Sequence, residues 1–289
     1  MFQLGGEADV GFTRLGADAA LQFKNMTNAR VFDTVPNVPD VQNVYLTNAL
    51  KSGALGGEVD LSFGHDAEVL HSFDQRTAGF DVTQTYLAYT ANNVTLQAGK
   101  FFTLAGAEYV RSSLNDEYSR SILFGYAIPF THTGVRLTYA PNAKVSYIAG
   151  ENLGWDQFKQ TSGNNTLEGG ILVNPSPDVT FSVQTYNGNE NDTLLHFVSS
   201  AVGHRILYDS VLTIKASNAL TITGNYDNAS QTNATLFDPA GRQAIARGVA
   251  RWGGFAAYLN YAITPKWTTT LRGETFYDHG GYRTGMINA

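Results

Sequence analysis

Apolar and polar residues alternate along most of the chain with a period of two, in segments of roughly ten residues. In residues 251–277, Leu259 lies on the apolar face of one predicted strand. After a break at Thr264-Pro265 the alternation restarts, with Leu271 on the face opposite to Arg272. No stretch longer than a turn or two shows helical periodicity. The pattern predicts an all-β chain whose strands each have one apolar and one polar face. Similar alternation occurs in residues 57–64, 132–140, 178–187 and 219–227.

The connections between the predicted strands are alternately short and long. Long loops without secondary structure are uncommon in a compact soluble domain, whereas short turns on one rim and long loops on the other are typical of outer-membrane barrels. We therefore expect a transmembrane antiparallel β-barrel with short periplasmic turns and long extracellular loops. Turn-forming residues mark the short connections at Ala91-Asn92-Asn93, Pro141-Asn142-Ala143, Ser176-Pro177, Ser217-Asn218 and Thr264-Pro265. Long polar loops are expected over residues 25–41, 65–79, 152–167, 188–204 and 228–248.

A barrel assigns the apolar face of each strand to lipid and the polar face to an aqueous lumen. Aromatic residues near strand ends, Trp252 and Trp267 among them, are predicted to lie at the membrane interfaces, where amphipathic rings are favoured. The side chains predicted to face lipid are Val59, Leu61, Val135, Leu137, Phe181, Ile222, Leu259 and Leu271.

The alternation allows about fourteen strands to be counted in a single barrel domain of residues 1–289. No closing strand is recognisable after Tyr282, and the chain lacks a terminal aromatic residue after an alternating strand. We therefore expect roughly 14–16 strands in the complete barrel, with the closing strand missing from this chain. The predicted strands start near residues 3, 16, 41, 54, 80, 94, 132, 144, 168, 178, 205, 219, 249 and 266.

Composition narrows the class of protein further. Charged residues make up 15% of the chain, below the roughly 25% of an ordinary soluble protein, as expected when one face of each strand meets lipid. The absence of cysteine excludes disulfide frameworks and cysteine-ligated metals. A formal net charge of -6 provides no basic surface for nucleic acid. No apolar run approaches the roughly 18 residues of a transmembrane helix.

The order of short and long connections fails once, in residues 103–131. If residues 122–128 formed another wall strand, two short turns would fall on opposite rims. The order is restored if 103–131 is one insertion that folds into the barrel and narrows it. A hairpin strand with an irregular rim loop is the alternative. Arg136, on the next strand, is a candidate partner for Asp116 or Glu117. The charged residues predicted at the constriction are Glu108, Arg111, Asp116, Glu117 and Arg120.

Strand parity predicts a lumen wall with eight acids and six bases. Because neither sign dominates, we expect weak ion selectivity with a mild preference for cations. The acids are Glu7, Asp9, Asp18, Glu58, Asp60, Asp209, Asp227 and Glu274, and the bases are Lys24, Arg136, Lys144, Lys215, Arg251 and Arg272.

Several stretches resemble the OmpL-like group of outer-membrane β-barrel porins. The most specific are "AGKFFTLAGAEYV" at 98–110 and "SRSILFGYAIPFTHTGVRLTYA" at 119–140. The stretches at 30–47, 80–89 and 152–157 and the final hairpin also fit, so the resemblance covers roughly residues 30–285. It implies a barrel in the outer membrane of a Gram-negative bacterium with pore activity. It transfers no catalytic motif to this chain.

Metal and catalytic sites are weakly indicated. The histidines do not share metal-ligand spacing with acids on one strand face; a loop cluster of His65, Asp66, Glu68 and His71 is the alternative cation site. No GxSxG motif occurs. We therefore predict no catalytic residue, no resident metal and no cofactor.

The function expected from these patterns is passive diffusion of small hydrophilic solutes or ions through an outer-membrane porin. The expected partners are these solutes and outer-membrane lipid, with no nucleic acid; a homo-oligomer stays open. The alternatives are a structural or adhesive barrel plugged by residues 103–131, an outer-membrane enzyme, and a soluble β-sandwich or solenoid. Conductance across a planar bilayer separates the first of these from a porin, and solubility without detergent would identify the last.

Overall fold

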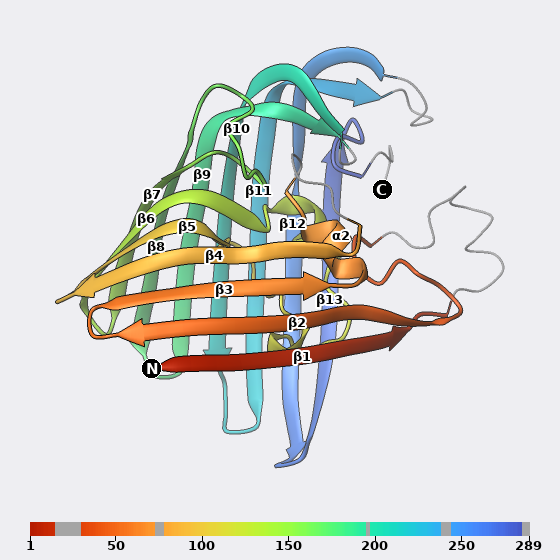
Figure 1. Ribbon diagram of the computed structural model, residues 1–289. Helices are drawn as coiled ribbons and strands as arrows, with labels where there is room; N and C mark the ends of the chain where they lie inside the picture. The colour runs from red at the N-terminus through yellow and green to blue at the C-terminus, as the bar shows by residue number, and fades with distance from the viewer. Residues whose placement is uncertain (15–29, 73–77, 195–196, 238–243, 285–289) are drawn as a thin grey trace.

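The computed structural model describes residues 1–14, 30–72, 78–194, 197–237 and 244–284 (Figure 1). Within these residues thirteen strands form one antiparallel sheet, and their order in space is their order in the chain. The all-β prediction is thus confirmed. The strands are β1 (Phe2–Phe12), β2 (Pro39–Ser52), β3 (Leu55–Phe63), β4 (Phe80–Ala91), β5 (Val94–Phe102), β6 (Thr131–Asn142), β7 (Val145–Asn152), β8 (Thr166–Ser176), β9 (Val179–Leu194), β10 (Phe197–Lys215), β11 (Leu220–Phe237), β12 (Ala244–Thr264) and β13 (Trp267–His279).

The sheet curls around an interior, as twisted antiparallel sheets do. In Figure 1, β1 to β4 cross the front of the view while β10 to β13 stand upright behind them. Among the described residues β1 pairs with β2 and β13 with β12, and no pairing joins β1 to β13, so these strands are the sheet edges. The strand expected near residue 16 lies outside the described residues, which leaves thirteen of the fourteen counted strands described.

The hairpin of β12 and β13 shows how alternation separates the two faces. Leu259 pairs with Leu271, and both side chains are exposed on the outer face. The next pair along the register, Tyr258 and Arg272, points inward, where Tyr258 is buried. Seven of the eight side chains predicted to face lipid are at least 37% exposed, and the eighth, Leu61, is half-buried.

One end of the sheet carries six short turns between neighbouring strands. The connections at 53–54, 92–93, 143–144, 177–178, 216–219 and 265–266 join strands at this end. The loops predicted at 188–204 and 228–248 are wrong: β9 and β10 run through the first region, and β11 and β12 through much of the second. Both regions begin with a run of mostly polar residues rich in Asn, at 188–193 and 228–235, and therefore resemble loops in sequence. Strand pairing requires only hydrogen bonds between neighbouring backbones, and β9 to β12 form these bonds with one another whatever their side chains.

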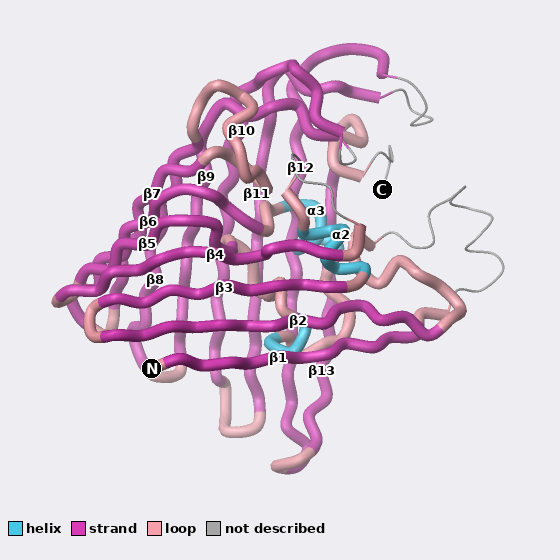
Figure 2. The backbone as a smooth tube through the Cα atoms, in the orientation of Figure 1, coloured by secondary structure: helices cyan, strands magenta, loops and turns pink. Residues whose placement is uncertain are grey.

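The helices in the described residues are short. They are α2 (His65–Leu70), the 3-10 turn η1 (Ser112–Leu114) and α3 (Ile122–Ala127). Figure 2 marks the helices in cyan; α2 contacts β2 to β4, and α3 contacts β11 to β13. None of the helices among the described residues is long and apolar enough to cross a membrane.

The buried core lies inside the curl of the sheet. Trp252, predicted at a membrane interface, is instead fully buried there; its ring packs edge-on against Trp155, with ring centroids 6.1 Å apart. Parity explains the error, because Trp252 shares the inward face of β12 with Tyr258. Trp267, in contrast, is 72% exposed on the outer face. The core also contains Phe32, Leu70, Val110, Leu123, Phe124, Ile128, Phe130, Tyr186 and Tyr282.

Candidate functional site: the segment across the interior

Residues 103–130 connect β5 to β6 and cross the interior of the sheet. Near the start, the Thr103 hydroxyl lies 3.1 Å from the Tyr186 hydroxyl on β9. The Ala107 amide donates to Asn225 Oδ1 on β11 over 3.1 Å. Arg111 then reaches Glu7 on β1. The segment thus contacts strands far apart in the sheet, and the alternative of a wall strand at 122–128 is wrong because α3 forms there.

Helix α3 is the anchor of this segment. The Ser121 hydroxyl caps it by accepting from the Phe124 amide over 2.9 Å. All residues from Leu123 to Phe130 are buried. At the far end of α3, Trp252 Nε1 donates to the Ala127 carbonyl over 3.0 Å. An apolar helix fixed at both ends is a rigid base for the residues that precede it.

Gly106 allows the segment to approach α3 closely. Its φ is +94°, a conformation that L side chains rarely adopt. A Cβ built there would come within 2.8 Å of Ile128 Cδ1. Glycine at this position therefore lets the chain turn directly over the anchor.

Glu108 joins the segment to β13. Its carboxylate accepts from the Ser121 amide at 3.0 and 2.8 Å and from the Ser121 hydroxyl. It also pairs with Arg272 Nη1 at 3.0 Å. Burial raises the pKa of the Glu108 carboxyl above its ordinary value, and the bonds from Ser121 and the charge of Arg272 oppose that shift. Glu108 is thus a buried connection between the segment and the wall.

The two bases of the segment are paired with acids from other elements. Arg111 pairs with Glu7 on β1 at 3.1 Å. Arg120 is buried and pairs with Asp66 on α2 at 3.1 Å, with its guanidinium 4.6 Å from the centre of the Phe32 ring. The predicted constriction residues therefore do not form one cluster, because Arg111 and Arg120 turn away from the acids.

Asp116 and Glu117 face β12 and β13. Asn260 Nδ2 donates to Asp116 Oδ2, and Glu117 pairs with Arg272 at 2.8 Å. The predicted pairing of Arg136 with either acid is wrong. Arg136 Nη2 lies 2.8 Å from Glu168 Oε1 on β8, the next strand but one from β6 in the sheet.

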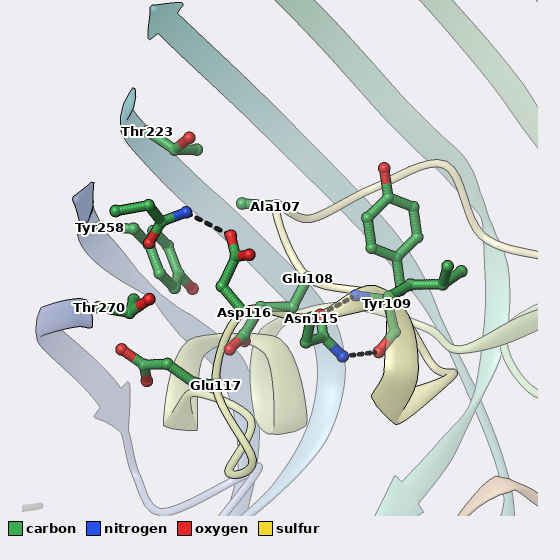
Figure 3. A pocket seen from close by; sticks show the side chains of 11 residues that line it. Ala107, Glu108, Tyr109, Asn115, Asp116, Glu117, Thr223, Tyr258 and Thr270 are labelled. Carbon is green, nitrogen blue, oxygen red and sulfur yellow. Dashed lines mark hydrogen bonds between the residues drawn. The ribbon is translucent and has the colours of Figure 1, made fainter. Parts of the chain in front are cut away.

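A cavity of about 100 Å³ lies between the segment and the wall formed by β11 to β13 (Figure 3). Most of its lining residues have polar side chains, which supply carboxylates, hydroxyls and amides. A second cavity, of about 190 Å³, is lined from the β3 and β4 side by Glu58 and Gln84. Glu108, Tyr109 and Leu114 line both cavities. The first is lined by Ala107, Glu108, Tyr109, Leu114, Asn115, Asp116, Glu117, Thr223, Tyr258, Asn260 and Thr270.

Most of the acids predicted on the lumen wall lie on the inward face. Asp60 Oδ2 accepts from Tyr45 at 2.8 Å, and Glu58 Oε2 accepts from Tyr86 at 2.7 Å. Asp209 and Asp227 are buried and occupy opposite positions on the neighbouring strands β10 and β11. Glu274 accepts from the Leu123 amide, and Glu7 pairs with Arg111. Asp9 has the inward parity of Glu7, and Asp18 lies outside the described residues.

The predicted wall bases are placed differently. Arg136 and Arg272 lie inward. The prediction that Lys144 lies on the wall is wrong, because Lys144 is exposed in the turn between β6 and β7. Lys215 is exposed at the end of β10. The prediction that Arg251 lies on the wall is also wrong. Arg251 has the same strand parity as Phe255 and is exposed on the outer face. Lys24 lies outside the described residues.

The loop cluster proposed as an alternative cation site does not assemble. His65 Nδ1 lies 2.7 Å from Asp40 Oδ2, whereas Asp66 pairs with Arg120. Among the described residues, no group of three or more histidine, aspartate or glutamate side chains is arranged to hold a metal ion.

The family model of Putative beta-barrel porin-2, OmpL-like, matches residues 2–289. Among solved structures, the outer membrane channel DcaP of Acinetobacter baumannii is similar, with a TM-score of 0.58 and 13% identity over 98% of this chain and 82% of that chain. OccAB1 of the same organism has a TM-score of 0.47 and 13% identity over 86% and 63%. The trimer form of Vibrio cholerae OmpT has a TM-score of 0.44 and 11% identity over 84% and 83%. No curated protein matches the chain in sequence.

At such low identity the likeness to DcaP shows a shared fold, and the family assignment rests on the sequence match along nearly the whole chain. Inward polar walls, an outward apolar face and short turns at one end agree with that assignment. The chain belongs to the OmpL-like β-barrel porins, channel proteins of the bacterial outer membrane.

Proposed function

We propose that the protein is a passive diffusion channel for small hydrophilic solutes and ions, narrowed by residues 103–131. The observation that carries this proposal is the position of residues 107–117, which stand between two cavities and line both with polar side chains. Passage through such a lumen requires only a polar wall and a narrow point. It requires no catalytic residue and no cofactor, and we assign none.

The surroundings of the channel follow from the two faces of the sheet. The exposed apolar side chains of the outer face are suited to lipid acyl chains. We place the short turns in the periplasm and the long connections outside the cell, as in other barrels of this type. That this protein forms a homo-oligomer remains a prediction.

A plugged structural or adhesive barrel is the second candidate, and one observation favours it. Trp155, Trp252 and Tyr282 are fully buried inside the curl, and the guanidinium of Arg205 lies 4.8 Å from the centre of the Trp155 ring. Arg283 stacks near the same two indole rings. This cluster fills part of the interior, so conductance has to be measured directly.

Deletion of residues 112–118 tests the constriction. It removes most of the exposed residues of the segment and leaves in place Glu108, Arg111 and Arg120 and their partners Arg272, Glu7 and Asp66. In planar bilayers we expect the wild type to conduct and the deletion to conduct several-fold more. Deletion of residues 158–164, an equally long piece of the β7–β8 connection, serves as the control and should change conductance little. A silent wild type that conducts only after the first deletion would favour the plugged barrel, and equal conductance in all three would place the segment outside the pathway.

A further inference from the structure

The charge balance of the interior differs from the balance that the sequence suggests. Of the six bases predicted on the lumen wall, Arg136 and Arg272 are the two that the described structure places inward. Lys144, Lys215 and Arg251 are exposed at a turn, at a strand end and on the outer face. Seven of the eight predicted acids keep the inward face. Among the predicted wall residues that the structure places inward, acids therefore outnumber bases by seven to two.

The excess is concentrated where the segment meets β13. Arg272 pairs with Glu108 at 3.0 Å and Glu117 at 2.8 Å, and its Nε lies 3.7 Å from Glu274. Asp116 lines the same cavity and accepts from the neutral amide of Asn260. Three carboxylates thus surround a single guanidinium, and the carboxylate of Asp116 is bonded to a neutral amide.

The two bases of the segment do not offset these acids. Arg111 pairs with Glu7 on β1, and Arg120 pairs with Asp66 on α2. Among the described residues Asp116 has no ion-pair partner. An anion in the cavity would therefore meet carboxylates without a free guanidinium or ammonium group.

We infer that this cavity selects small cations, both inorganic ions and organic ammonium solutes, over anions; the inference rests on the proposed channel function. Fixed charge at a narrow point sets ion preference, and low-dielectric walls strengthen its field. An ammonium group has three donors and no acceptor, so it requires acceptor oxygens. The carboxylates of Asp116 and Glu117, the hydroxyls of Thr223 and Thr270 and the amide oxygen of Asn260 line the cavity.

The buried part of the lining fixes this arrangement. Tyr258 is 93% buried, with 7% of its surface exposed, and its hydroxyl donates to Ser121 Oγ over 3.3 Å. Asn115 holds the turn of the segment by accepting from the Tyr109 amide and donating to the Tyr109 carbonyl, both over 2.8 Å (Figure 3). The acids are therefore presented by a positioned turn, and substitution of two of them should change selectivity more than structure.

Reversal potentials of the full-length protein in planar bilayers, under a KCl gradient, provide the first test. We expect the wild type to pass K⁺ several-fold better than Cl⁻. The Asp116→Asn, Glu117→Gln double variant should lose most of that preference. Asp178→Asn, which removes one charge from the exposed turn between β8 and β9, should keep it.

A wild type that conducts but prefers Cl⁻, or shows no preference, would overturn the inference while leaving the channel function intact. Unchanged selectivity in the double variant would also overturn it, because the preference would then arise elsewhere. A wild type that does not conduct contradicts the proposed function instead.

The second test concerns organic cations. 1,4-Diaminobutane added to one side should reduce the K⁺ current of the wild type, whereas 1,4-butanediol, a neutral chain of the same length, should have little effect. The diamine block should weaken several-fold in the double variant and persist in Asp178→Asn. Equal effects of diamine and diol on the wild type would show that the cavity does not recognise ammonium groups.

Discussion

The two parts of the interior segment have opposite relations to solvent. Residues 109–118 include the exposed Tyr109, Leu114 and Asp116, whereas every residue from Leu123 to Phe130 is buried. Residues 109–118, the channel part, line the cavities. Residues 123–130, the anchor part, include most of α3 and are bonded to β12 through Trp252. A constriction inside a wet lumen thus combines a piece stabilised by burial with a piece whose polar groups remain accessible. Substitutions in the two parts should therefore have different consequences.

The largest difference is expected for apolar side chains. Phe124→Ala should lower the free energy of unfolding by about 3–5 kcal/mol, because it leaves a cavity in the core. Leu114→Ala in the channel part, where the side chain is 52% exposed, should cost no more than about 0.5 kcal/mol. Denaturant unfolding in detergent micelles measures both. Similar costs would show that the two parts are equally buried in the folded protein.

The next effect concerns the bond between β12 and the end of α3. Trp252→Phe removes the donor to the Ala127 carbonyl and should cost about 1–3 kcal/mol. Trp267→Phe, on the outer face, should change stability little. Tryptophan fluorescence in brominated lipid supplies a second readout, since the bromine should quench the emission of Trp267 and leave that of Trp252 unchanged. Strong quenching of Trp252 would mean that its side chain faces the membrane and not the anchor part.

Much of this fold could be predicted from the sequence. Period-two alternation and turn residues located most of the strands and five of the six short turns at one end of the sheet, since both signals are local. The inward direction of Arg272 follows from parity. The segment at 103–131 was detectable because it broke the order of short and long connections. Its constriction role stays a prediction.

The remaining features depend on contacts that no local pattern records. The six residues of α3 are too few for helical periodicity to be recognised, and its formation follows from burial against β11 to β13. Arg136 could not be assigned to Glu168 without knowing which strands face each other. Arg251 was grouped by strand parity with the polar lumen wall, although its register position is that of Phe255 on the outer face. Charge is thus a weaker guide to orientation than strand register.

A smaller, pH-dependent effect is expected at Glu108, which links the two parts. Because burial raises the pKa of this carboxyl, the folded protein keeps the proton to higher pH than the unfolded chain does. Stability should then fall as pH rises from the unfolded pKa of about 4.3 through the folded pKa, with no further change above it. Glu108→Gln should lack this component of the pH profile. Unfolding titrations at several pH values compare the two proteins, and parallel profiles would contradict a raised pKa.

The smallest effect on stability is expected at Asn115, inside the channel part. Its side chain bonds the Tyr109 amide and carbonyl at 2.8 Å and the Arg111 carbonyl at 3.1 Å. Because the site is half-exposed, water can replace these bonds, and Asn115→Ala should cost no more than about 1 kcal/mol. The freed turn should nevertheless move, so open-channel current noise should rise. Asn115→Asp keeps the acceptor for the Tyr109 amide and should therefore show less open-channel current noise than Asn115→Ala in single-channel recordings. If neither variant alters the noise, the turn is held by other contacts, and the channel part is more rigid than its exposure indicates.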